Sequence, residues 1–307
     1  TKMNGSLMLF FGLNILVALT ALPSTPLGFT RAVNAWFDKN KGLALGISLT
    51  STGIAATLLP KLLTPYVEEH GWRAGYFTLF LIVIIAIPFI WLLIKEQPSD
   101  DDQNDQQKAA SNLTGLQLQE VLKTMTFWKL AAIFFLVSTA VLGLIPSFIP
   151  LLQDAQLNAD KVGSLAAILG LSVMIGRLVT GFLIDRFFSP RVVTGIFTFV
   201  ALGCLALGLG GIQFALLGAI ALGLAVGAEV DLIGYFTAKY FGMKHYGSIY
   251  GVMYSIFSLG AIISPALAGL IWDKTGNYDL ALVLAAVLVG IAVIFSLLLP
   301  RFSDNLR

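Results

Sequence analysis

The chain has 307 residues, of which 57% are hydrophobic and only 12% charged, and its mean hydropathy is +0.86. Soluble domains carry about 25% charged residues, so this composition, with apolar runs of about 20 residues, indicates an all-α integral membrane protein. A net charge of +2 argues against a protein that binds nucleic acid.

Apolar spans follow one another along the chain, separated by short polar turns. We predict nine membrane helices, at residues 5–36, 42–66, 72–95, 127–152, 161–187, 191–209, 212–240, 247–272 and 279–300. The first span contains Pro23 and Pro26, which predict a bend within one helix.

One connection, residues 96–126, is long. Its segment 99–108 is rich in Asp, Asn and Gln, and we expect it to be disordered. The spacing of the leucines and valine in 116–122 predicts a short amphipathic helix at the membrane interface. The predicted organisation is therefore a partial N-terminal bundle of three helices (1–95), a linker (96–126) and a C-terminal bundle of six helices (127–307).

Cysteine and histidine are scarce. Cys204, the single cysteine, lies inside an apolar run, so it forms no intrachain disulfide and is expected to be a small core residue. His70 and His245 lie in polar turns away from other metal-ligand residues, and we expect neither a metal site nor a cofactor. The sequence has no HExxH or GxSxG motif and no intramembrane histidine, which argues against a membrane-embedded enzyme.

Lysine and arginine indicate the orientation. The side of the membrane that carries the 96–126 linker collects about thirteen of them, and the opposite side about five. This asymmetry predicts that the linker and the C-terminus are cytoplasmic, in a multi-pass protein of the cell (inner) membrane. Arg177 belongs to neither group because it lies inside a span.

An internal repeat relates two parts of the chain. The residues Gly42, Gly46, Pro60 and Gly71 recur about 205 residues later as Gly247, Gly251, Pro265 and Gly276. Shared spacing of glycine and proline predicts shared helix contacts and bends, in two halves related by an axis along the membrane normal. Three spans, 127–152, 161–187 and 191–209, have no counterpart in the first half, so we expect about three further helices upstream.

With this repeat and the turn Gly181-x-x-x-Asp185-Arg186, the chain resembles the major facilitator superfamily of transporters over its fourth to twelfth helices. The segments Trp36–Gly46, Gly71–Arg73 and Tyr240–Gly251 are most similar to the branch of monocarboxylate and oxalate/formate transporters. The resemblance implies a secondary active transporter with two pseudo-symmetric helical bundles.

Within that branch, an arginine of the eighth helix binds the substrate carboxylate, and Arg177 stands at the matching position. The resemblance also implies that Gly181, Asp185, Arg186 and Arg191 form a cytoplasmic gating turn, latched by ion pairs. Some positions differ from the branch: the site of an aspartate found in many monocarboxylate carriers is Val173, and 247–272 lacks the lysine of oxalate carriers. These differences favour a substrate with one carboxylate.

The charge of Arg177 needs a physical reason, since it lies ~12 Å deep in a ~30 Å hydrocarbon core, where a charge costs at least ~3 kcal/mol. A structural arginine bound to carbonyls or a neighbouring helix is one reading. An anion site is the other, because the guanidinium fork suits a carboxylate.

Glu229 and Asp231 lie at a similar depth and point to nearly opposite faces of their helix, so only one can face a given cavity. One of them is expected to compensate Arg177 or to carry a coupling proton, but the sequence does not say which. Tyr250 and Tyr254 recur at four-residue spacing and could orient a carboxylate, or could equally serve as contacts between helices.

The predicted function is therefore transport of a small organic anion of monocarboxylate type by alternating access, coupled to protons or to anion exchange. The expected partners are that anion, protons and the lipid bilayer, and the protein is expected to be monomeric. A carrier of another small solute, such as a drug or a sugar, and a non-transporting receptor on the same fold remain alternatives.

Overall fold

The computed structural model describes residues 7–21, 30, 33, 36–37, 41–93 and 115–302, and within these residues the fold is helical. The helices are α1 (Leu7–Ala21), α3 (Lys41–His70), α4 (Trp72–Leu93), α6 (Leu118–Val121), α7 (Met125–Val141), α8 (Leu144–Asp154), α9 (Ala159–Arg186), α10 (Ser189–Gly210), α11 (Ala215–Phe241), α12 (Tyr246–Thr275) and α13 (Asp279–Leu297), with a 3-10 turn, η2 (Ile212–Phe214), before α11.

Every one of the nine predicted spans contains a helix. In the described part of the chain, seven segments are long and apolar enough to cross a membrane, and α1 and the stretch 42–55 of α3 are shorter apolar helices. The bend expected at Pro23 and Pro26 and the disorder expected in 99–108 lie outside the described residues.

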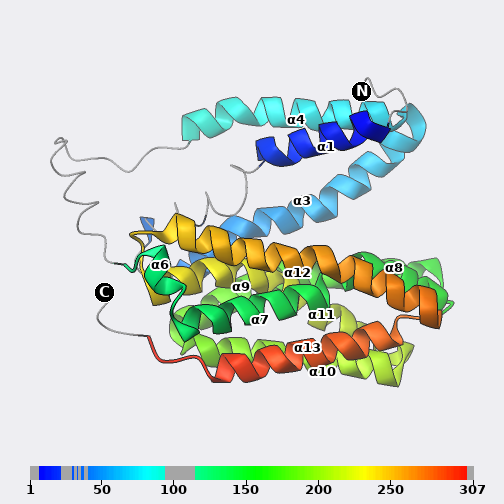
Figure 1. Cartoon of the computed structure of the whole chain (residues 1–307). Coiled ribbons are helices and arrows are strands. Elements are labelled where there is room, and N and C mark those ends of the chain that lie inside the picture. The colour runs from blue at the N-terminus through cyan, green and yellow to red at the C-terminus, as the bar shows by residue number, and fades with distance from the viewer. Residues whose placement is uncertain are drawn as a thin grey trace.

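Helices α7 to α13 pack together into one bundle (Figure 1). Its core is made of side chains such as Phe134, Phe197 and Phe236, each no more than 1% exposed. Close contacts between helices use small residues: a Cβ on Gly203 of α10 would collide with Ala221 of α11. In lipid, where burial of apolar surface adds little, such close approach is what holds helices together.

One span of this bundle is broken in the middle. Helix α7 ends at Val141 and α8 begins at Leu144, and between them the N–H of Gly143 donates a 2.6 Å hydrogen bond to the Ser264 hydroxyl of α12. Pro265 lies in the α12 helix beside that serine. The side-chain bond satisfies a backbone donor at the start of α8, which is how an interrupted helix is tolerated at membrane depth.

Helices α1 and α4 lie apart from this bundle, and α3 joins them to it (Figure 1). The first half of α3 packs on α9, where Leu45 and Leu49 are buried. Further along, α3 slopes away from α9, and Ile54 and Leu62 are exposed. The α3–α9 contact is therefore concentrated near the start of α3.

The internal repeat has a structural counterpart at its last position. Gly71 and Gly276 each end a long helix with a positive φ, +80° and +72°, a conformation that glycine adopts without strain. The two halves differ at the first positions. Gly42 and Gly46 lie tightly against α9, whereas Gly247 and Gly251 have no neighbour within 4 Å of an added Cβ among the described residues.

The amphipathic segment expected in 116–122 forms a single helical turn, α6. Its Val121 is fully buried, and the preceding Leu116 N–H donates to the Phe241 carbonyl at 2.9 Å. This pairing places the turn against the end of α11, so its apolar side chains pack on the bundle core.

Candidate functional site

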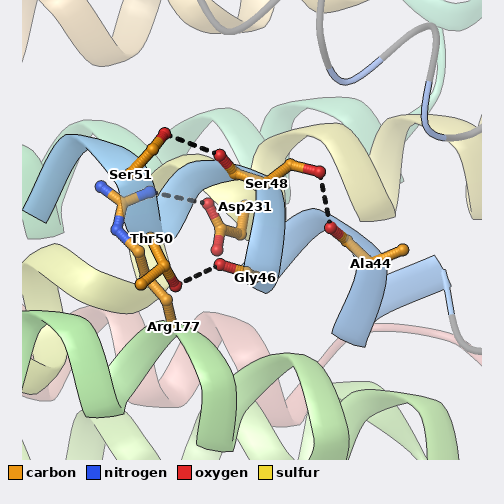
Figure 2. Close-up of polar contacts among 7 residues, drawn as sticks. All are labelled: Ala44, Gly46, Ser48, Thr50, Ser51, Arg177 and Asp231. Carbon is orange, nitrogen blue, oxygen red and sulfur yellow. Dashed lines mark hydrogen bonds and ion pairs between the residues drawn. The ribbon is translucent and has the colours of Figure 1, made fainter. Parts of the chain in front are cut away.

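Arg177 and Asp231 form an ion pair between α9 and α11. The Arg177 Nη1 atom lies 3.2 Å from the Asp231 Oδ1 atom, and the side chains are 9% and 1% exposed (Figure 2). Arg177 is nine residues before the end of α9 and Asp231 ten before the end of α11, so both lie roughly 13–15 Å from that edge of the bundle. The structure thus selects Asp231 as the acid that compensates Arg177.

Two glycines let neighbouring helices close on the helical turn that carries Arg177. A Cβ built on Gly46 of α3 would lie 2.7 Å from the Arg177 carbonyl oxygen. One built on Gly227 of α11 would lie 3.0 Å from the Arg177 backbone nitrogen and would collide with the Val173 carbonyl. The missing side chains bring both backbones onto α9, and this contact fixes the height and direction of Arg177.

The ion pair uses only part of the hydrogen-bonding capacity of the Arg177 guanidinium and the Asp231 carboxylate. Arg177 Nε and Asp231 Oδ2 are buried and have no hydrogen-bond partner among the described residues. A guanidinium has five N–H donors in a fixed fork, and a carboxylate accepts at both oxygens. The pair therefore retains capacity for a further ligand, and a carboxylate is the ligand that such a fork fits best.

Glu229 lies apart from this pair. It is 1% exposed, and neither of its oxygens has a hydrogen-bond partner among the described residues. Two residues from Asp231, it is rotated by about 200° around α11, onto the face that carries the buried Ala225 and Phe236. The structure therefore does not bring Glu229 to Arg177.

Tyr250 and Tyr254 stand in a row of aromatic rings along α12. The row runs through Tyr246, Tyr250, Tyr254 and Phe257 with centroids 5.6 to 5.8 Å apart, and the rings of Tyr250 and Tyr254 are nearly parallel. The hydroxyl of Tyr250 is buried, makes no hydrogen bond of regular geometry with a described residue, and lies near enough to Asp231 for the two to interact electrostatically. Of the two tyrosines, Tyr250 is the one on which Asp231 acts electrostatically.

The predicted gating turn gains a partner from α3. The Asp185 carboxylate accepts hydrogen bonds of 2.9 Å from the backbone N–H groups of both Gly42 and Leu43, the first turn of α3. A negative charge there also interacts favourably with the positive end of the helix dipole. Gly181, one turn earlier on α9, lies directly against Gly42, and a Cβ on either would collide with the other's carbonyl.

This arrangement differs from the ion-pair latch expected for the turn. Arg186 and Arg191 instead lie over aromatic rings, with the Arg186 Cζ atom 4.0 Å from the Phe182 ring centre and that of Arg191 5.7 Å from Phe188. Neighbours on a helix such as Asp185 and Arg186 do not face each other, so the carboxylate turns to α3 while the guanidinium turns outward. Among the described residues, Asp185 meets α3 as a helix cap, and the gating role of this turn stays a prediction.

Some polar residues near the site were not predicted from the sequence. Ser48, Thr50 and Ser51 of α3 are drawn with the ion pair in Figure 2, and each hydroxyl donates to a carbonyl of its own helix, on Ala44, Gly46 and Ser48 respectively. The sequence feature that could have indicated them is the run of hydroxyl-bearing residues in 48–52.

Thr30 is fully buried and accepts a 3.1 Å hydrogen bond from the Tyr246 hydroxyl. No local pattern marks that contact, because 216 residues separate its partners.

No group of three or more His, Cys, Asp or Glu side chains that could hold a metal ion is found in the part of the chain that the structure describes. The groups gathered here are a guanidinium and a carboxylate in an ion pair, with a tyrosine that Asp231 influences electrostatically.

The family model described as Major Facilitator Superfamily matches residues 3–228 and again residues 143–305. The overlapping double match agrees with the internal repeat. This is a family of transporters and not of enzymes, in agreement with the motifs that the sequence lacks.

Curated relatives include monocarboxylate transporters. Monocarboxylate transporter 12 of Rattus norvegicus is 28% identical over an alignment of 302 positions, gaps included, which covers 88% of this chain and 61% of the relative. Monocarboxylate transporter 11 of Homo sapiens is 27% identical over an alignment of 313 positions, which covers 96% of this chain and 64% of the relative. The chain therefore spans less than two thirds of the length of these relatives.

A solved structure shares the fold. The transporter FucP, crystallised in the outward conformation, superposes with a TM-score of 0.63 at 15% identity, over 86% of this chain and 70% of that one. With the family match covering most of its length, the chain belongs to the Major Facilitator Superfamily.

Proposed function

We propose that this chain is the greater part of a secondary active transporter that moves a small organic anion with one carboxylate by alternating access. The observation that carries the proposal is the Arg177–Asp231 pair, a buried guanidinium only partly used by its counter-charge. The names of the curated relatives, which are monocarboxylate transporters, support the same substrate class.

In this proposal the empty site is electrically balanced, because Asp231 compensates Arg177. An entering carboxylate binds the side of the guanidinium fork that Asp231 leaves open, and the Tyr250 hydroxyl donates a hydrogen bond to it. A proton on Asp231 then keeps the net charge of the occupied site unchanged, which couples the anion to a proton. In exchange for a second anion, the site carries one negative charge in each direction, so no net charge crosses the membrane and no proton is needed.

Alternation is proposed to involve the contact between α3 and α9. Asp185 caps the first turn of α3, and Gly42 and Gly181 allow the two backbones to touch. The lysine and arginine distribution supports the assignment of this end to the cytoplasmic side. Release of the cap would free the cytoplasmic ends of the helices, while the protein remains a monomer in the cell membrane.

Uptake by proteoliposomes tests the proposal. The complete protein should take up radiolabelled monocarboxylates from a panel of differing size, and Arg177→Gln should abolish uptake while the protein stays monodisperse in detergent. Arg177→Lys keeps the charge but loses the planar fork, and should retain only a small part of the activity. Full uptake by Arg177→Gln would overturn the anion site, and specific binding without flux would favour a receptor.

A further inference from the structure

A second contact joins the N-terminal segment to the bundle, away from α9. Thr30 lies between α11 and α12: its Oγ1 accepts the Tyr246 hydroxyl, and its Cβ atom would be 3.3 Å from a Cβ built on Gly234. Both Thr30 and Tyr246 are at most 1% exposed. Gly234 is therefore the residue that makes room for this contact on α11.

This contact is continuous with the anion site. The Tyr246 ring is followed by that of Tyr250 at 5.6 Å, and Tyr250 lies within electrostatic reach of Asp231. Four residues separate the two tyrosines along α12, so their rings lie one above the other on one face. A displacement of the Tyr246 ring therefore acts directly on the Tyr250 ring, on which Asp231 acts electrostatically.

The contact also lies at the same end of the molecule as the Asp185 cap. Tyr246 is the first residue of α12 and Asp185 is the penultimate residue of α9, and α3, which begins eleven residues after Thr30, is capped by Asp185. Thr30 thus contacts α11 and α12, and Gly42 and Leu43 contact α9. Both contacts must separate if this end opens.

We propose that the Thr30–Tyr246 hydrogen bond is a second closure contact, and that Tyr246 is a positioning residue that holds Tyr250 beside Asp231 while this end of the molecule is closed. The inference rests on the proposed carrier function. It adds two residues, Thr30 and Tyr246, to the Arg177–Asp231 pair and the Asp185 cap. The state that binds substrate from the opposite side is then stabilised by two separate contacts.

Removal of one hydroxyl at a time tests the contact. In the complete protein, Tyr246→Phe and Thr30→Val keep the side-chain shapes and should each raise the apparent KM for external substrate roughly two- to tenfold, the loss of population expected from one net hydrogen bond. Thr30→Ser keeps the hydroxyl and should restore a KM near that of the wild type. The effect of the double variant should be smaller than the sum of the two single effects, since both substitutions remove the Tyr246–Thr30 hydrogen bond.

Tyr240→Phe is the matched control. The Tyr240 hydroxyl donates to the Pro300 carbonyl at 2.7 Å, a bond within the bundle, so its loss should leave the KM unchanged. An unchanged KM in Tyr246→Phe and Thr30→Val, or an equal rise in Tyr240→Phe, would overturn the proposal. So would additive effects in the double variant.

Hydrogen exchange gives a readout that does not need transport. The Gly42 and Leu43 amides are protected by Asp185 at the other closure contact. In Tyr246→Phe and Thr30→Val, the peptide that contains these amides should exchange roughly two- to tenfold faster, with no change in Tyr240→Phe. Faster hydrogen exchange in the variants of a protein that shows no flux would contradict the carrier function but support the closure contact. Flux together with unchanged exchange in the variants would support the carrier function but contradict the closure contact.

Discussion

The Arg177 guanidinium and the Asp231 carboxylate meet through one contact of 3.2 Å, although both side chains are almost fully buried. Breaking a buried ion pair on one side leaves an uncompensated charge, which is far more costly than having no pair at all. Each group therefore holds the other in place. A ligand that displaces the Asp231 carboxylate from the Arg177 guanidinium must itself be an anion.

The two acids of α11 should behave differently when neutralised. Asp231→Asn leaves Arg177 buried without a counter-charge and should lower the free energy of unfolding by roughly 3–5 kcal/mol. Glu229→Gln removes no partner and should change it by no more than about 1 kcal/mol. Melting in detergent and uptake driven by a pH gradient measure both effects, and uptake should survive only in Glu229→Gln.

A double replacement separates stability from transport at the same site. Arg177→Met with Asp231→Leu substitutes apolar groups for the whole pair, so most of the stability lost in Asp231→Asn should return. Uptake should not return, because the fork that binds the anion is gone. Uptake by the double variant would show that the pair is structural.

The glycines that press on the Arg177 turn should not tolerate alanine. In Gly46→Ala and Gly227→Ala the new methyl groups meet α9 backbone atoms, and the overpacking should cost roughly 1–3 kcal/mol of stability. Gly195→Ala on α10 is the control, since nothing lies within 4 Å of its Cβ and alanine favours a helix. Equal melting temperatures for all three variants would contradict the close contact.

The Asp185 cap predicts an order of effects at the start of α3. Asp185→Ala should destabilise this contact by roughly 0.5–2 kcal/mol and speed exchange of the Gly42 and Leu43 amides. Asp185→Asn keeps one acceptor oxygen and should lie between alanine and the wild type. Arg186→Gln should leave exchange unchanged because Arg186 stacks on Phe182 outside the cap. Faster hydrogen exchange of these amides in Arg186→Gln would instead support an ion-pair latch that involves Arg186.

Membrane orientation can be tested with single cysteines. The native Cys204 is fully buried, so Cys204→Ala provides an unreactive background at little structural cost. In that background, Asp105→Cys in the linker should react with a membrane-impermeant maleimide only in inside-out vesicles, and Asn277→Cys only in intact cells. The opposite labelling pattern would invert the predicted topology.

Much of the architecture was predictable from the sequence. Apolar runs separated by polar turns require helices, because a backbone in lipid must satisfy its own hydrogen bonds. The isolated arginine in an apolar run marked Arg177 as a residue that needs a partner or a ligand. The repeated glycines predicted shared helix contacts and bends; Gly71 and Gly276 do share a left-handed backbone, but Gly42 and Gly46 contact α9 whereas Gly247 and Gly251 have no described neighbour within 4 Å of an added Cβ. All of these signals are local or periodic.

What only the tertiary structure decided was how each helix is rotated and which distant residue it meets. A shift of two positions turns a side chain by about 200°, so Glu229 and Asp231 look alike in the sequence until α11 is packed on α9. The partners of Asp185 are more than 140 residues away, and those of Tyr246 more than 210. These distant contacts depend on how closely whole helices approach each other at glycines. That close packing determines how each helix is rotated and therefore which of its side chains meet a neighbour.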